Sequence, residues 1–233
     1  MKRIYKISVV VTLVLLTLVS VERASAQGSA HSYDLSDYNV VSERGIIHTE
    51  WGVGVGGVFT LARPITEGVD IAPRIGLQGH LDMAVCFGQN FAIETKIIYG
   101  GGSMDVRAQY VDSGGVMRSF DKRVKTRTMD IPVLLSARAL NSRLRFNAGV
   151  MFTVLSRGEY NEGNDVMMYG AVAPTFNLTA GMGVCITRNF MLEARYIFAL
   201  QTTANQINGS QQSPGLEFDS RYDRIVAGVT VLF

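Results

Sequence analysis

The sequence is poor in the residues that build disulfide frameworks and metal sites, with two cysteines and three histidines among 233 residues. Both cysteines, Cys86 and Cys185, lie inside apolar stretches, and neither has a second cysteine or a histidine at zinc-motif spacing. The predicted strands that carry them, the second and sixth of eight in a ring, lie opposite each other, beyond the reach of a disulfide. We therefore expect two free thiols, no bound metal and no cofactor.

The sequence also lacks a sustained helical period and a concentration of positive charge. A nucleic-acid-binding protein needs a clustered basic face, so nucleic acid is excluded as a partner. The glycines Gly52, Gly54 and Gly57 fit the spacing G-x-G-x-x-G, but they alternate with valine and no strong strand precedes them. We interpret them as small inward positions of a strand rather than as a nucleotide-binding loop.

The N-terminal residues have the three parts of a secretory signal. Basic residues within the first six positions precede the apolar run 7–21, and the small residues Ala24–Ala26 follow it. The run is shorter than the roughly 20 apolar residues of a spanning helix. We predict a signal peptide at residues 1–26. Four of the 22 basic and one of the 20 acidic residues precede the cut, so the mature chain carries a net charge of −1.

Alternation of apolar and polar residues recurs from residue 51 to the C-terminus and predicts an all-β chain. Most of the alternating segments reach the roughly 9–11 residues that a tilted strand needs to cross a bilayer. In each of them one set of alternating positions is nearly free of charge. The predicted strands are residues 51–61, 74–87, 91–101, 125–139, 144–156, 172–186, 190–200 and 221–233.

A soluble β-sandwich and a transmembrane barrel share this period, but the links between the strands distinguish them. Short links at 88–90, 141–143 and 187–189 alternate with long links at 62–73, 102–124, 157–171 and 201–220. This alternation is typical of an outer-membrane barrel with short periplasmic turns and longer surface loops. Aromatic residues bracket the short turns and the chain end, as in an interfacial girdle: Trp51, Phe87, Phe91, Phe146, Phe190 and Phe233.

We therefore predict an eight-stranded antiparallel up-and-down transmembrane β-barrel at residues 51–233, in the outer membrane of a Gram-negative cell. Residues 27–50 are expected to form a periplasmic N-terminal extension. We expect link 102–124 to continue its two strands as a hairpin above the membrane. Link 201–220 is polar, and we expect it to be irregular. Either link could bind a partner or be a solvated surface.

Several segments carry a family resemblance: WGVGVGGVF at 51–59, MDIPVLLSARAL at 129–140, RFNAGVMF at 145–152, the hairpin 176–200 and VAGVTVLF at 226–233. Together they resemble the PorT-like outer-membrane β-barrel family of Bacteroidota, and Asp130–Leu135 is the most specific of them. The resemblance covers roughly residues 51–233 and implies the fold and the membrane. A role in secretion or envelope assembly is its nearest functional extension, with envelope or secretion proteins as partners of the surface loops or the periplasmic N-terminus.

The inward set of alternating positions carries the candidate functional residues. Eight strands enclose a space that side chains can just fill, and buried charges must pair. We interpret the set as an ionic plug in a non-enzymatic protein with a structural or surface-interaction role. The alternative is a lipid A-modifying hydrolase or acyltransferase with His80 and Asp82 as its base, although no nucleophile is identifiable. The predicted lumen network is Arg74, His80, Asp82, Glu94, Lys96, Asp130, Arg138, Arg145, Glu193, Arg195 and Arg224.

Overall fold

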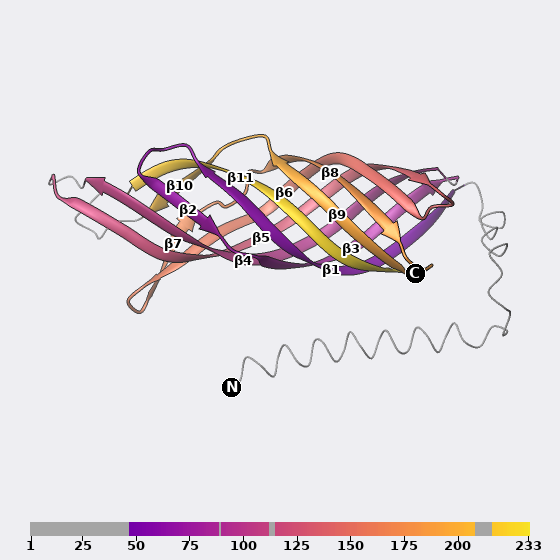
Figure 1. The fold of residues 1–233 in the computed structure, drawn as a ribbon, viewed down its shortest axis with the longest axis horizontal. Helices are drawn as coiled ribbons and strands as arrows, with labels where there is room; N and C mark the ends of the chain where they lie inside the picture. Colours follow the sequence, from indigo (N-terminus) through magenta and orange to yellow (C-terminus); the bar gives the residue numbers. More distant parts are fainter. Residues whose placement is uncertain (1–46, 89, 112–114, 208–215) are drawn as a thin grey trace, which may run out of the picture. The chain divides into compact units, whose positions relative to one another are not determined.

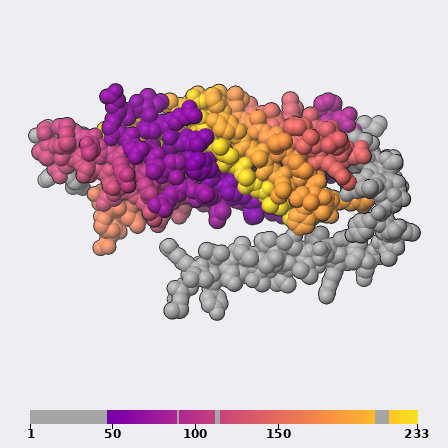
Figure 2. All heavy atoms as spheres, in the orientation of Figure 1, coloured from indigo at the N-terminus to yellow at the C-terminus, as the bar shows by residue number. Residues whose placement is uncertain are grey.

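The computed structural model describes residues 47–88, 90–111, 115–207 and 216–233. Eight long strands form a closed antiparallel ring (Figure 1), and the first and last of them lie side by side, indigo against yellow, in Figure 2. The predicted eight-stranded barrel is confirmed. In order around the ring the strands are β1 (Ile47–Pro64), β3 (Gly76–Phe87), β4 (Phe91–Val111), β5 (Met117–Ala139), β6 (Leu144–Glu162), β8 (Phe176–Cys185), β9 (Phe190–Ala199) and β11 (Leu216–Leu232).

The ring closes through the ladder between β1 and β11, which runs from Gly52 opposite Leu232 to Pro64 opposite Ser220. Strand β1 begins at Ile47 rather than at residue 51, so residues 47–50 belong to the barrel and not to the expected N-terminal extension. The predicted signal at 1–26 and most of that extension lie outside the described residues. No helix in the described part is long and apolar enough to span a membrane.

Strict alternation gives the barrel wall two chemically different faces. In β9 the buried residues, among them Glu193 and Arg195, alternate with the exposed Leu192, Tyr196 and Phe198. Every second side chain of a strand points to the same face, so the apolar set faces out around the ring and the charged set faces in. An apolar exterior around a closed ring is what lipid requires.

Exposed aromatic side chains collect at the end of the barrel that holds the short turns. Phe87 and Phe91 lie opposite each other beside the first turn, and the backbone nitrogen of Phe233 donates to the carbonyl of Trp51 at 2.9 Å. Phe146 and Phe190 begin or nearly begin the strands that follow the other two turns. These residues therefore have the positions of an interfacial girdle on the periplasmic side.

Three further strands, which the sequence did not indicate, continue the barrel at the opposite end (Figure 1): β2 (Val69–Pro73), β7 (Asp165–Gly170) and β10 (Thr203–Ile207). Strand β2 replaces β3 beside β4, β7 replaces β8 beside β6, and β10 replaces β9 beside β11. The expectation that link 201–220 is irregular was wrong, because residues 203–207 pair with 216–220. The turn signals expected at 208–209 and 214–215 lie outside the described residues.

The polarity of the wall inverts in this part, which we call the extension. Outward positions of β4 and β5 carry Arg107, Asp121 and Arg123, whereas the inward Val106 and Val124 are fully buried. Charged outward side chains do not face hydrocarbon, so the extension stands in water beyond the membrane. Its interior is an apolar core of Val69, Ile71, Met104, Val106, Ala108, Phe120, Val124, Tyr160, Tyr169, Val172, Ile207, Phe218 and Tyr222.

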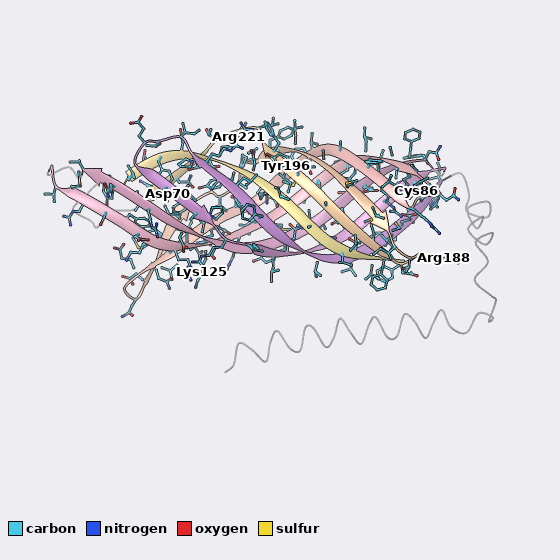
Figure 3. The ribbon with its side chains drawn as sticks, viewed as in Figure 1. Asp70, Cys86, Lys125, Arg188, Tyr196 and Arg221 are labelled. Atoms are coloured by element: carbon cyan, nitrogen blue, oxygen red, sulfur yellow. The ribbon has the colours of Figure 1, made fainter. Side chains whose placement is uncertain are left out.

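The predicted hairpin above the membrane is part of the extension. The ladder between β4 and β5 continues to Val111 opposite Met117, and only the turn residues 112–114 lie outside the described part. Figure 3 shows Lys125 on the outer surface of this region and Cys86 near the opposite end of the barrel. The molecule therefore has a charged-outside, apolar-inside half and an apolar-outside, charged-inside half on one continuous wall.

Candidate functional site

Charged side chains occupy the membrane-spanning part of the lumen in three layers. Each layer holds equal numbers of basic residues and carboxylates if His80 is neutral, and the three layers together hold five of each. We define the outer layer, beneath the extension, as Asp130 and Arg224, the central layer as His80, Asp82, Lys96, Glu193 and Arg195, and the periplasmic layer as Glu50, Glu94, Arg138 and Arg145.

The central layer is built by two adjacent strands and one across the lumen. Asp82 and Lys96 lie opposite each other in the ladder of β3 and β4, and Lys96 Nζ donates to Asp82 Oδ2 at 2.8 Å. Lys96 Nζ also donates to Glu193 Oε2 at 2.6 Å, and Arg195, two residues further along β9, donates to the same oxygen at 3.2 Å. Charge-assisted hydrogen bonds of this kind are among the stronger ones in proteins.

His80 lies in the central layer because β1 leaves space for it. Its Nε2 is 2.9 Å from Thr230 Oγ1, 3.4 Å from Glu193 and 3.7 Å from Asp82, and its side chain is 1% exposed. A Cβ on Gly54 would overlap this imidazole and would lie 2.6 Å from the carbonyl of Val229. Glycine at this position therefore lets a histidine fill the lumen where β1 and β11 meet.

The other members of the glycine motif belong to the same strand. Gly52 and Gly54 face the lumen from β1, whereas Gly57 lies on the opposite face. The dinucleotide-binding reading needs a strand before the motif and a helix after it, and here the motif lies inside a strand. Gly52 and Gly54 are wall residues at crowded inward positions, whereas the expectation that Gly57 faces inward was wrong.

The outer layer is one buried ion pair with further hydrogen bonds. Arg224 donates to both carboxylate oxygens of Asp130, at 2.7 and 3.3 Å, and the hydroxyl of Thr153 donates to Asp130 at 2.6 Å. Asp130 belongs to the segment that carries the family resemblance, two residues before Pro132 in the middle of β5. The ladder with β4 is interrupted there, as expected for a residue without a backbone N–H.

The periplasmic layer centres on Glu50, which sequence reasoning missed. Its two carboxylate oxygens accept hydrogen bonds from Arg138 at 2.9 Å and Arg145 at 3.0 Å, while Arg138 also lies 3.6 Å from Glu94. Glu50 falls on the inward set of β1, two residues before Gly52, but the strand was expected to start at residue 51. The excess of basic over acidic residues in the predicted network could have pointed to a missing carboxylate.

The placement of Arg74 in the lumen network was wrong. Arg74 lies in the link between β2 and β3, its side chain is 51% exposed, and it pairs with Asp105 at 2.8 Å on the outer surface. Alternation places residue 74 inward only if β3 extends that far, and β3 begins at Gly76 because β2 has taken its place beside β4. Hydrogen bonds from Arg74 and Arg123 lower the pKa of the Asp105 carboxyl.

Two small cavities border the charged layers in the described part of the chain. A cavity of about 40 Å³ lies between the outer layer and the extension, and one of about 20 Å³ lies beside the periplasmic and central layers. Volumes of this size hold one or a few water molecules rather than a solute. Both cysteines are free, as predicted, and Cys86 is fully buried.

Comparison with known proteins agrees with this architecture. The chain matches the family of outer membrane protein beta-barrel domains over residues 26–205. Its fold is similar to that of the outer membrane protein OprG from Pseudomonas aeruginosa, with a TM-score of 0.50, 11% sequence identity and coverage of 79% of this chain and 95% of that chain. No curated protein matches the chain.

Two further solved structures are similar at lower scores. Neisserial surface protein A has a TM-score of 0.45 and 12% identity, with coverage of 78% of this chain and 96% of that chain. Ail, the attachment invasion locus protein of Yersinia pestis, was solved with the heparin analogue sucrose octasulfate and has a TM-score of 0.44 and 10% identity, covering 79% and 99% of the two chains. The identity of 11% with OprG shows a shared fold and no shared role.

Proposed function

Because the chain belongs to the family of outer membrane protein beta-barrel domains, we propose that it is a closed outer-membrane barrel that acts without catalysis, as a structural or surface-interaction protein. The observation that carries this proposal is the filling of the lumen. Three layers of paired charges occupy the spanning part, and the apolar core of the extension covers them on the outer side. An eight-stranded ring has an interior that side chains can fill in this way.

The extension offers a firm surface on which a partner could dock. Its core includes the edge-to-face pairs Phe120–Tyr160, with ring centroids 5.0 Å apart, and Tyr169–Phe218, at 5.8 Å. Such pairs contribute about 0.5–1.5 kcal/mol each beyond the area they bury. Packing of this kind makes the extension a continuation of the barrel rather than a set of loose loops. Its outer face is charged and suits a hydrophilic partner.

The finer identity of the protein is part of the same proposal. The resemblance of Asp130–Leu135 and the neighbouring segments to PorT-like barrels favours a role in secretion or envelope assembly. Partners would then be envelope or secretion proteins, reached through the extension or through the periplasmic residues that precede β1. Residues 1–26 would be removed as a signal peptide, which delivers the chain to the envelope.

The geometry gives the enzymatic alternative little support. His80 is buried in the lumen and faces Thr230, Asp82 and Glu193, so a lipid in the surrounding bilayer does not reach it. A general base must lie within hydrogen-bond reach of the proton it removes. Mass spectrometry of lipid A from wild-type and deletion strains tests this alternative directly, and we expect identical profiles.

Site-specific photo-crosslinking in whole cells tests the surface role. Gln109 and Ser119 are exposed and lie opposite each other on the outer face of the extension, whereas the exposed Leu135 faces lipid. We expect a photoreactive residue at position 109 or 119 to capture a specific envelope protein, and one at 135 to capture lipid only. The same protein bands at all three positions, or none at 109 and 119, would contradict a partner at the extension.

A further inference from the structure

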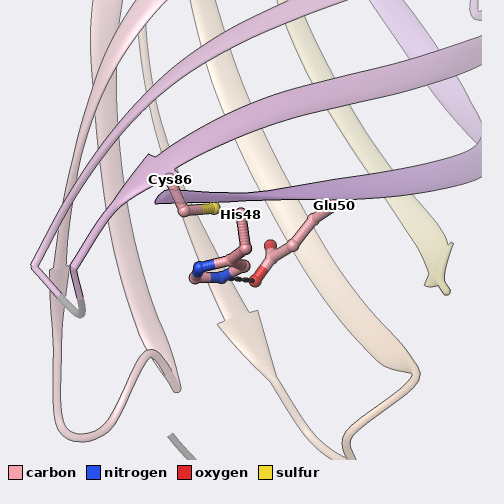
Figure 4. Close-up of side chains that lie close together, drawn as sticks. All are labelled: His48, Glu50 and Cys86. Atoms are coloured by element: carbon pink, nitrogen blue, oxygen red, sulfur yellow. Dashed lines mark ion pairs between the residues drawn. The ribbon is translucent and has the colours of Figure 1, made fainter. Parts of the chain in front are cut away.

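A histidine, a carboxylate and a thiol meet at the periplasmic mouth of the barrel (Figure 4). His48 and Cys86 lie opposite each other in the ladder of β1 and β3, and Glu50 follows His48 on the same face of β1. One nitrogen, one carboxylate oxygen and the sulfur all lie within 4.8 Å of one another. His48 Nε2 is 3.7 Å from Glu50 Oε1. Side chains opposite each other in an antiparallel pair are close enough to share an ion.

Two observations indicate that this group is suited to a ligand. The Nδ1 atom of His48 is buried without a hydrogen-bond partner in the described part of the chain, and a buried polar atom left in this way carries a free-energy penalty. The side chain of His48 is 17% exposed, so an ion can enter from the periplasmic side, while Cys86 is fully buried behind it. Neither His48 nor Cys86 belongs to the three ionic layers of the lumen.

The chemistry of the donors selects the ion. A thiolate, an imidazole and a carboxylate are the side-chain ligands of zinc sites, and three protein ligands leave a fourth position for water. Glu50 accepts hydrogen bonds from Arg138 and Arg145, and a carboxylate with about four lone-pair sites can bind arginine and a metal at once. Arginines bonded to a ligating carboxylate then orient it from the outer shell.

We propose that His48, Glu50 and Cys86 bind one zinc ion at the periplasmic mouth. Binding releases the thiol proton of Cys86 to solvent, because the thiolate is the ligand. The periplasmic layer is neutral without the ion, so two positive charges added and one proton lost leave it at +1. The ion ties the first residues of β1 to the end of β3, where the chain enters the barrel wall.

Cobalt substitution tests the site in the folded mature barrel, purified without a histidine tag and stripped of metal by a chelator. Co²⁺ bound through a thiolate has a sulfur-to-cobalt charge-transfer absorption, which Zn²⁺ abolishes by displacement. We expect one Co²⁺ per chain in the wild type. Cys86→Ser should lose the absorption, and His48→Gln should weaken Co²⁺ binding by at least about tenfold.

Cys185→Ser is the matched control, because the other cysteine belongs to no group of three metal-ligating side chains in the described residues. This variant should keep the absorption. Thermal unfolding gives a second readout. At one Zn²⁺ concentration, the rise in melting temperature should be large in the wild type and in Cys185→Ser and smaller in His48→Gln. A cooperative transition of His48→Gln without the ion shows that this variant is folded. No absorption in the wild type, or one that survives Cys86→Ser, would overturn the proposal.

Discussion

Removing the negative charge of Glu193 should destabilise the barrel strongly. Its side chain is 3% exposed and accepts hydrogen bonds from Lys96 at 2.6 Å and Arg195 at 3.2 Å. Loss of one partner of a buried pair lowers the free energy of unfolding by about 3–5 kcal/mol, because the remaining charge stays buried without compensation. Asp82 still pairs with Lys96 at 2.8 Å, so Arg195 is the charge left alone. We therefore expect Glu193→Gln to lose about 3 kcal/mol.

Denaturant unfolding in lipid or detergent measures this loss through the fluorescence of Trp51, the one tryptophan of the sequence, which is exposed on the lipid-facing side. Asp121→Asn is the control. Asp121 lies 3.5 Å from Arg107, and the two side chains are 69% and 67% exposed, respectively. Losing this exposed ion pair should change the free energy of unfolding by about 0–1 kcal/mol. The double variant Arg195→Met with Glu193→Gln should recover at least about 1 kcal/mol, because it also removes the charge that Glu193→Gln leaves alone. A Glu193→Gln loss no larger than that of the control would refute the reasoning.

Three further outcomes are expected. Gly54→Ala should lower the free energy of unfolding by about 1–3 kcal/mol, because its Cβ would lie 2.6 Å from a backbone carbonyl of β11. Gly57→Ala should be tolerated, because its Cβ meets its nearest neighbours at 3.9 Å. Heat-modified mobility on gels compares the folded fractions of the two variants. An NMR titration should give the Asp105 carboxyl a pKa below its ordinary value, so that its ion pair is present at neutral pH and is lost as the pH falls through that lowered pKa. Arg74→Gln should raise the pKa of Asp105. An unchanged pKa in this variant would contradict the ion pair between Arg74 and Asp105. The intact mass of the purified membrane form should correspond to a chain beginning at Gln27, and retention of residues 1–26 would contradict a periplasmic N-terminus.

The barrel could be predicted from the sequence because its constraint is local. Lipid on one face and paired charges on the other impose period 2 on every spanning strand, and the short turns fix which strands are neighbours. In β9 this pattern is unbroken, from exposed Phe190 to buried Ala199. The same reasoning places Glu193 and Arg195 on one face, where the structure has them bonded.

The extension could not be predicted in the same way, because period 2 does not say which face is wet. Val106 and Val124 continue the alternation of their strands, yet they point into an apolar core and not toward lipid. The short strands β2, β7 and β10 carry too few residues for a pattern to be distinct. Their places follow from pairing with long strands, which is a long-range property.

The errors at the site have a related cause, since alternation gives the face of a residue but not the ends of a strand. Starting β1 at residue 51 excluded Glu50, and extending β3 back to residue 74 included Arg74. His48 and Cys86 are adjacent only because of the register between β1 and β3. Their separation along the chain matches no metal motif, so the sequence alone does not pair them.

Single-channel recording in planar bilayers tests the closed lumen most directly. The ionic layers and the apolar core of the extension place side chains across the lumen, and the cavities of about 40 and 20 Å³ beside them each hold one or a few water molecules. The wild-type protein, folded and inserted, should therefore show no steady ion conductance over the voltages that the bilayer tolerates. Large and stable single-channel currents from the wild type would contradict the filled lumen and, with it, the proposal that this barrel acts through its surface and not as a pore.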